Sequence, residues 1–175
     1  MTGNWTLRAV TEDDLPMLLG WRNHPSIRDF MLTRHEITRE EHRDWFARAS
    51  KDETRRLLIV EERTEPLGYV QFANVGRGGI SDWGFYARPG APKGTGRKLG
   101  TVALSHGFDI LELHKVCGQA IASNQASIAL HASLGFIREG MLRDQYLIDG
   151  LYHSLVCFGL LRAEWRPTER FGEPT

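Results

Sequence analysis

The sequence predicts an α/β fold built around a mixed sheet, and three features of its patterning carry that prediction. Strand-like and helix-like stretches alternate along most of the chain. Three β-rich runs, at residues 57–61, 67–73 and 80–87, follow one another closely, which favours an antiparallel meander. The dipeptide Asp149-Gly150 separates two further β-rich runs, and it is the strongest short signal for a β-hairpin.

The chain begins with a predicted strand followed by two helices. Residues 5–10 alternate apolar and polar side chains, as a half-buried strand does. Thr11 offers a helix cap with acidic residues in the first turn, and this helix should end just before Pro25, which disfavours helical geometry in its predecessor. A capping box that begins at Thr38 opens the second helix, which carries Trp45.

A Pro- and Gly-rich cluster at residues 88–92 closes the meander. We expect a long helix over residues 95–113, because apolar residues recur there at helical spacing. A strand, a helix and the beginning of a second strand follow, at residues 116–122, 124–134 and 136–141.

Length and composition favour one domain over residues 1–165, with a polar tail at 166–175. A chain of 175 residues with 41% hydrophobic content can bury a substantial core. Its 22 basic and 22 acidic side chains cancel, so no net field attracts nucleic acid or an anionic membrane. The N-terminus lacks a leader pattern, so we expect a cytoplasmic protein. Cys117 and Cys157 have no partner at metal-ligand spacing, which predicts two reduced core thiols and no bound metal.

A glycine-containing loop precedes the helix predicted from residue 95, and this arrangement favours an anion-binding site. Backbone N–H groups in the first turn of a helix have no internal partner, and the helix dipole adds positive potential there. Gly94 and Gly96 let anion oxygens approach these groups without a side chain in the way. Lys93, Arg97 and Lys98 add positive charge at the rim. The spacing fits neither a Walker loop nor a dinucleotide-binding turn.

Two segments, in this order, resemble the motifs of the GNAT superfamily of acetyltransferases. Residues 91–96 resemble the loop Arg/Gln-x-x-Gly-x-Gly/Ala that holds the pyrophosphate of coenzyme A, with Ala91 in place of the first residue. Residues 124–136 resemble the segment Asn-x-x-Ser/Ala-x-x-Leu-Tyr-x-x-x-Gly-Phe. The resemblance implies a mixed, mostly antiparallel sheet of about seven strands with splayed central strands, flanked by about four helices. It also implies acetyl-CoA as the acetyl donor, bound by Phe85, Tyr86, Ala87, Lys93, Gly94, Thr95, Gly96, Arg97, Lys98, Asn124, Ser127 and His131.

The same resemblance implies direct attack of an amine on the thioester in a ternary complex, without an acyl-enzyme. A free backbone N–H at Phe85 or Tyr86 would stabilise the charge that develops on the carbonyl oxygen. Many family members protonate the departing thiolate with a Tyr, and here that position holds His131, whose donation would depend on its protonation state. The general base stays open among Asp82, Glu36, His35, His42 and an ordered water.

The acceptor is indicated by residues 20–28 and 35–46. They resemble the acetyltransferases of pseudaminic acid biosynthesis, a pathway of flagellin glycosylation, which acetylate the 4-amino group of a UDP-linked 4-amino-4,6-dideoxy-N-acetylaltrosamine. The resemblance implies a nucleotide-sugar acceptor, with apolar contacts to its methyl and acetamide groups and arginine contacts to its diphosphate. The implied substrate-binding residues are Trp21, Arg22, Met31, His35, Trp45 and Tyr86.

Two other functions stay open. The Trp-Arg-Asn segment at residues 21–23 also occurs in acetyltransferases that modify protein N-termini, including ribosomal ones, so a protein α-amine is an alternative acceptor. His131 in place of Tyr is the one feature that favours a coenzyme A-binding sensor without catalysis. The C-terminal hairpin offers a surface through which two copies could form a homodimer.

Overall fold

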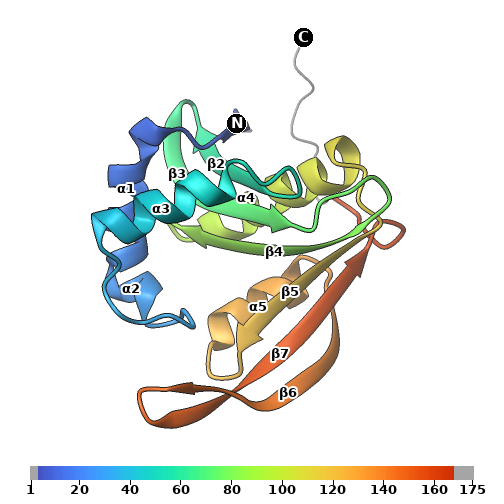
Figure 1. Cartoon of the computed structure of the whole chain (residues 1–175). Helices are drawn as coiled ribbons and strands as arrows, with labels where there is room; N and C mark the ends of the chain where they lie inside the picture. Colours follow the sequence, from blue (N-terminus) through green and yellow to red (C-terminus); the bar gives the residue numbers. More distant parts are fainter. Residues whose placement is uncertain (1–3, 168–175) are drawn as a thin grey trace.

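The computed structural model describes residues 4–167 and contains a seven-stranded sheet with helices on both faces (Figure 1). The strands lie in the order β1-β2-β3-β4-β5-β7-β6, and every neighbouring pair is antiparallel except β4 and β5. The strands are β1 (Trp5–Ala9), β2 (Arg56–Glu62), β3 (Glu65–Ala73), β4 (Ile80–Ala87), β5 (Lys115–Ile121), β6 (Ile137–Ile148) and β7 (Leu151–Leu161). The α-helices are α1 (Leu15–Asn23), α2 (Pro25–Arg28), α3 (Arg39–Ala49), α4 (Thr95–Ser105) and α5 (Gln125–Ser133). The predicted mixed, mostly antiparallel sheet is confirmed.

The sheet is nearly divided in two at its parallel pair. Strands β4 and β5 share three residue pairs, from Ile80 opposite Lys115 to Asp82 opposite Cys117. Beyond these pairs the two strands diverge, as Figure 1 shows. The predicted splaying of the central strands is therefore confirmed, and it separates the half-sheet β1–β4 from the half-sheet β5–β7.

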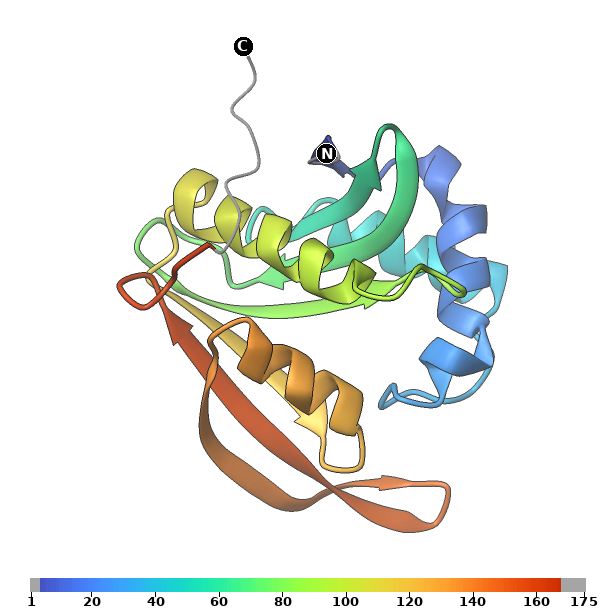
Figure 2. The same cartoon turned by 180° about the vertical axis from the view of Figure 1, so that it is seen from behind.

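Helices cover the half-sheet β1–β4 on both faces. Helices α1 and α3 lie on one face and α4 on the other, and α5 lies against β5 and β6 on the same side as α4 (Figure 2). Strand β2 is buried on both faces as a result, because successive side chains of a strand point in opposite directions. Leu57 and Ile59 join the core beneath α1 and α3, while Leu58 and Val60 join the core beneath α4.

The N-terminal helices follow most of the predicted signals. Thr11 caps a 3-10 turn, Glu12–Asp14, that leads into α1, so α1 itself begins later than predicted, at Leu15, and it ends at Asn23, before Pro25. Helix α3 begins at a capping box in which the N–H of Glu41 donates to Oγ1 of Thr38 at 3.2 Å and the N–H of Thr38 donates to Oε2 of Glu41 at 2.7 Å. The four-residue helix α2 has no predicted counterpart, because so short a segment shows no helical period.

The helix predicted over residues 95–113 is shorter than expected. Helix α4 ends at Ser105 and a single π-helical turn, His106–Ile110, continues it. Glu112 then adopts a φ of 52°, a left-handed conformation that a helix cannot continue through. Leu113 fits the apolar spacing of a helix, but it reaches the core after the chain has left the helix, so its spacing did not indicate helical structure.

Both predicted hairpins are present. Asp149 and Gly150 adopt φ values of 51° and 78°, the positive angles that a type I′ turn requires. Arg63 and Thr64 also have positive φ, at 53° and 71°, so the turn between β2 and β3 is shorter than the polar connection suggests.

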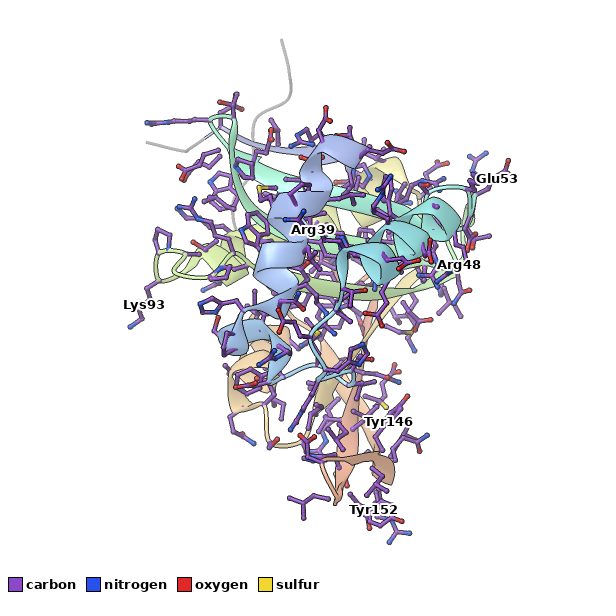
Figure 3. The ribbon with its side chains drawn as sticks, turned by 60° about the vertical axis from the view of Figure 1, so that its left-hand side comes forward. Arg39, Arg48, Glu53, Lys93, Tyr146 and Tyr152 are labelled. Carbon is purple, nitrogen blue, oxygen red and sulfur yellow. The ribbon has the colours of Figure 1, made fainter. Side chains whose placement is uncertain are left out.

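The far end of the β6–β7 hairpin is exposed and carries Tyr146 and Tyr152 (Figure 3). Cys117 and Cys157 are free but only half-buried, which corrects the prediction of two core thiols. The reason is that α5 covers only the opposite face of β5 and β7. Of the predicted tail at 166–175, residues 168–175 lie outside the described residues.

Candidate active site

A cavity of about 900 Å³ runs through the gap between β4 and β5. Its walls come from both faces of the sheet, so two ligands can meet inside it from opposite sides. The wall on the α4 and α5 side includes Thr95, Gly96, Asn124, Ser127, Leu130 and His131. The wall on the α1 to α3 side includes Arg22, Met31, His42, Trp45, Tyr69 and Tyr86.

The loop before α4 presents free backbone donors to this cavity. Gly94 is the N-cap of α4 and has a φ of 91°, a conformation that favours glycine. The N–H of Thr95 donates to the carbonyl of Pro92, and that of Lys98 donates to the carbonyl of Gly94. In the described part of the chain, no hydrogen bond to another loop group uses the N–H of Gly96 or of Arg97. This helix start fits a phosphate group.

The three cations predicted at the rim are placed differently from one another. Lys93 is exposed at the tip of the loop (Figure 3). Arg97 is also exposed. The Nζ of Lys98 lies 5.7 Å from the ring centroid of Trp5, so this side chain turns toward β1 rather than toward the cavity. Lys98 therefore adds little to anion binding at the start of α4, which depends mainly on the backbone N–H groups.

The second motif forms the start of α5. Oδ1 of Asn124 accepts a hydrogen bond from the N–H of Ser127 at 3.1 Å, which is a side-chain N-cap. Both residues line the cavity, and so does His131 one turn further on. The pattern Asn-x-x-Ser therefore fixes the helix end that faces the gap.

The imidazole of His131 is buried, with 2% of its surface exposed, and both ring nitrogens are engaged. Nδ1 lies 2.8 Å from the carbonyl oxygen of Ser127, to which only a protonated Nδ1 can donate. Nε2 accepts a hydrogen bond from the indole N–H of Trp83 at 3.2 Å. Burial lowers the pKa of His131, which favours this neutral form. A neutral ring held in this way has no free proton to give, so the geometry disfavours the acid role expected from the family pattern.

The backbone of β4 directs particular N–H groups into the cavity. The N–H of Arg88 donates to the carbonyl of Leu67 on β3 at 2.8 Å. Successive residues of a strand point their polar groups to opposite neighbours, so Tyr86 also faces β3, while Phe85 and Ala87 face the β5 side. Strand β5 does not pair with β4 at this level. Of the two predicted oxyanion donors, the register therefore favours Phe85.

On the acceptor side, Arg22 brings an uncompensated charge to the cavity. Its Nη2 donates to the carbonyl of Thr33 at 2.9 Å. Its Nη1 is buried and has no hydrogen-bond partner, and no carboxylate in residues 4–167 forms an ion pair with it. Burial lowers the pKa of this guanidinium, although such a group stays charged. A half-buried cation with one buried, unpartnered nitrogen is costly unless a ligand supplies the anion.

A row of rings lines the same side. His42 stacks on Trp45 with 5.1 Å between ring centroids, Trp45 meets Tyr69 edge-on at 6.4 Å, and Tyr69 lies 5.2 Å from Tyr86. Burial raises the pKa of both tyrosine hydroxyls well above the ordinary value. The two phenols are therefore neutral and can offer hydrogen bonds together with apolar surface.

Two residues predicted for the acceptor site lie elsewhere. Trp21 packs against the core beneath α1 and α3 and does not line the cavity. His35 is exposed, and its Nε2 lies 3.1 Å from Oε1 of Glu41. Of the four side chains considered as general base, His42 lines the cavity, whereas Asp82, Glu36 and His35 do not.

Sequence reasoning missed several residues of the cavity. They come from α2 and the turn after it and from strands β3, β4, β5 and β7: Ile27, Phe30, Leu32, Tyr69, Gln71, Trp83, Gln119 and Leu155. The alternation in residues 67–73 could have placed Tyr69 and Gln71 on one face, since side chains two apart in a strand point the same way. The sequence carries no comparable signal for the register that brings Gln119 to the cavity.

Over residues 4–167 no group of three or more His, Cys, Asp or Glu side chains is arranged to hold a metal ion. In the same part of the chain, no helix has the length and apolar character needed to cross a membrane.

Residues 4–137 match the family model described as the acetyltransferase (GNAT) domain. The acetyltransferase PseH of Campylobacter jejuni serotype O:2 is 25% identical over 139 residues, which are 79% of this chain and 87% of that protein. The spermidine N(1)-acetyltransferase of Vibrio cholerae is 25% identical over 170 residues, covering 94% of this chain and 97% of the other. A crystal structure of the spermidine N-acetyltransferase from Vibrio cholerae in complex with CoA and spermine matches with a TM-score of 0.84 at 24% identity, covering 92% of this chain and 97% of that chain.

Proposed function

We propose a specific acceptor for this chain, which belongs to the GNAT acetyltransferase family and is an acetyl-CoA-dependent N-acetyltransferase. The acceptor is the 4-amino group of a UDP-linked 4-amino-4,6-dideoxy-N-acetylhexosamine. The acetyltransferase PseH of Campylobacter jejuni is one of its relatives. The resemblance of residues 20–28 and 35–46 to acetyltransferases of pseudaminic acid biosynthesis, a pathway of flagellin glycosylation, supports the same acceptor. The spermidine acetyltransferases are others at similar identity, so the choice of acceptor depends on the cavity itself.

The observation that carries the proposal is the unpaired Arg22 on the acceptor side. A nucleotide sugar brings a diphosphate, which the free Nη1 of Arg22 can bind. A polyamine would instead require free carboxylates. Glu41 is the one carboxylate among the cavity-lining residues of the described chain, and both its oxygens are engaged, by His35 and by the N–H of Thr38. The charge of the cavity therefore favours an anionic acceptor.

The apolar part of the acceptor wall suits the sugar ring. Ile27, Phe30 and Met31 line the cavity beside Arg22, and Trp45 faces them from α3. A 6-deoxy sugar with an acetamide presents methyl groups that gain from such contacts. Among the residues proposed earlier for this acceptor, Arg22, Met31, Trp45 and Tyr86 support it by their position, while Trp21 and His35 do not.

The donor half of the proposal uses the backbone. The coenzyme pyrophosphate would lie at the start of α4, on the N–H groups of Gly96 and Arg97, with Lys93 at the rim. The thioester would lie in the gap, where the N–H of Phe85 can donate to the carbonyl oxygen as it gains charge. The acceptor enters from the other face and attacks directly, so no acyl-enzyme forms.

We also propose that the enzyme works in the cytoplasm and forms a homodimer through the β6–β7 hairpin. The support for the dimer is the exposed apolar surface of that hairpin, which includes Leu147, Leu151 and Tyr152. Light scattering of the purified chain tests it.

Thiol release from acetyl-CoA tests the acceptor. The panel consists of the UDP-amino sugar, spermidine and a peptide with a free N-terminal amine. We expect turnover with the UDP-amino sugar and much less with the other two. Efficient turnover of only spermidine, or of only the peptide, would show that this amine and not the UDP-amino sugar is the acceptor. Binding of acetyl-CoA without turnover of any amine would support a non-catalytic sensor.

A variant pair connects the result to Arg22. Arg22→Gln should raise the KM for the UDP-amino sugar about tenfold or more, because a hydrogen bond to a charged group contributes about 1.5–3 kcal/mol. Arg48→Gln, which removes an exposed arginine at the end of α3 (Figure 3), should leave that KM unchanged. Equal KM values in the two variants would show that Arg22 does not bind the diphosphate.

A further inference from the structure

His42 occupies a distinctive place in the acceptor half of the cavity. Its ring lines the cavity, is stacked on Trp45, and has only 7% of its surface exposed. The hydrogen bonds made by histidine rings within residues 4–167 are those of His24, His35 and His131, so no group in this part of the chain bonds to a ring nitrogen of His42. An imidazole with an available nitrogen in a ligand cavity can accept a proton from a bound amine.

We propose that His42 is the general base that removes the proton from the acceptor ammonium. This inference rests on the acetyltransferase activity and on the side of the cavity at which the amine enters. It does not depend on whether that amine belongs to a nucleotide sugar.

The other titratable side chains of the cavity are less suited to this role. They are Arg22, Glu41, Tyr69, Tyr86, Arg88 and His131. The two arginines are already cationic. Oxygens of Glu41 are held by Thr38 and His35, and Nε2 of His131 accepts from Trp83. The two tyrosines are buried phenols that keep their protons. His42 is the remaining neutral group of the cavity, and its ring nitrogens have no hydrogen-bond partner within residues 4–167.

The surroundings of His42 keep it neutral near pH 7. On the elements packed around it, the charged and titratable groups that line the cavity are Arg22 of α1, Glu41 of α3, Tyr69 of β3 and Tyr86 of β4. Burial lowers the pKa of His42, and the positive charge of Arg22 lowers it further. A neutral ring is the form that accepts a proton, so the base is ready before the acceptor binds.

The proton balance of the reaction is simple. The acceptor ammonium gives one proton to a ring nitrogen of His42 and becomes a neutral amine. The amine nitrogen then forms a bond to the carbonyl carbon of the thioester, and the carbon–sulfur bond breaks. The second proton of that nitrogen neutralises the departing thiolate, and His42 later releases its proton to solvent.

The first test compares His42→Gln with wild type and with His114→Gln. His114 is exposed at the opposite end of β5 from the cavity, so it controls for loss of a histidine. The acceptor is the UDP-amino sugar, or spermidine if the sugar is not acetylated, which separates this test from the acceptor proposal. We expect kcat to fall about a hundredfold or more in His42→Gln, in line with general-base catalysis, with acetyl-CoA affinity unchanged.

The pH profile supplies a readout that a structural role would not move. Wild-type kcat/KM should decline on the acid side, below the ordinary histidine pKa, as His42 becomes protonated. His42→Gln should lose this acid limb while His114→Gln keeps it. A His42→Gln enzyme that retains both its kcat and its acid limb would overturn the proposal. His42→Asn serves as a second variant if the first has a lowered melting temperature.

An NMR titration gives an answer independent of activity. The ring nitrogens of His42, assigned by their absence in His42→Gln, should report a neutral imidazole at pH 7 in the ligand-free protein. A ring that is protonated at pH 7 would exclude His42 as the base.

Discussion

The indole N–H of Trp83 donates a hydrogen bond to Nε2 of His131 across 3.2 Å, and Gly118 leaves the space in which the two rings meet. A Cβ at position 118 would lie 2.5 Å from Nε2 of His131 and 2.8 Å from Nε1 of Trp83. The contact joins β4 to α5 across the wall of the cavity, so it couples the two half-sheets at the level where their strands no longer pair.

The Trp83–His131 contact makes Gly118→Ala a strong perturbation. We expect a loss of about 1–3 kcal/mol in the free energy of unfolding, because both rings must move within a packed core. Urea denaturation measures the loss. Gly140→Ala is the matched control, since a Cβ on this strand residue would meet no atom within 4 Å. Equal stability of the two variants would contradict the proposed packing.

The conformation of Gly94 predicts a specific loss of coenzyme affinity. A residue with a side chain at its φ of 91° carries a strain of about 1–2 kcal/mol. If the loop relaxes to relieve that strain, Gly94→Ala should bind acetyl-CoA about five- to thirtyfold more weakly. Isothermal calorimetry measures the change. Gly20→Ala in α1, where a Cβ meets nothing within 4 Å, should bind like wild type.

Removing the charge of Arg22 should leave the stability of the fold nearly unchanged, although this charge is proposed to bind the acceptor. Arg22→Met keeps most of the side-chain volume and deletes a half-buried cation that has no ion-pair partner in the described chain and whose Nη1 is buried. We expect the free energy of unfolding to stay within about 1 kcal/mol of wild type or to rise, because replacing a buried charge with an apolar group is often neutral or stabilising. A loss of several kcal/mol in denaturant titrations would show that Arg22 is needed for folding.

Three histidines predict how stability depends on pH. Burial lowers the pKa of His42, His106 and His131, so the unfolded chain binds more protons than the folded chain once the pH falls below the ordinary histidine value. The free energy of unfolding should therefore be insensitive to these groups above about pH 7 and decrease as the pH falls below about 6.5.

His131→Gln checks the contribution of one of these groups. The amide oxygen of Gln can still accept from Trp83, but the side chain does not titrate. The variant should show a shallower decrease in stability between about pH 6.5 and 5 than wild type. Parallel curves for the two proteins would show that His131 does not stay neutral in the fold.

Local signals in the sequence predicted the elements well. The capping box at Thr38, the proline at residue 25 and the Asp149-Gly150 turn each act within a few residues, so they can be read without the fold. The helix from residue 95 was predicted too long because Leu113 matches the helical period although the chain has already turned. The burial of Leu113 depends on tertiary contacts, which local spacing cannot show.

The donor side of the site was easier to predict than the acceptor side. The cradle at Gly94 and Gly96 and the cap at Asn124 are short motifs, and the structure brings them together at one cavity. The acceptor wall depends on which face of α1 and α3 meets the sheet. Trp21 and Trp45 both pack against the core beneath α1 and α3, but of the two Trp45 alone also lines the cavity, and helical spacing alone cannot distinguish them.

The divergence of β4 and β5 gives the molecule two unpaired strand edges in its interior. Edges of this kind on a surface invite association with other chains, and here the helices on either side restrict access to them. The pantetheine arm of the acetyl donor is slender and carries amide groups, so it can enter where a polypeptide strand cannot. In each catalytic cycle the pantetheine arm would then lie between the edges of β4 and β5 like an additional strand, and it would leave with the product.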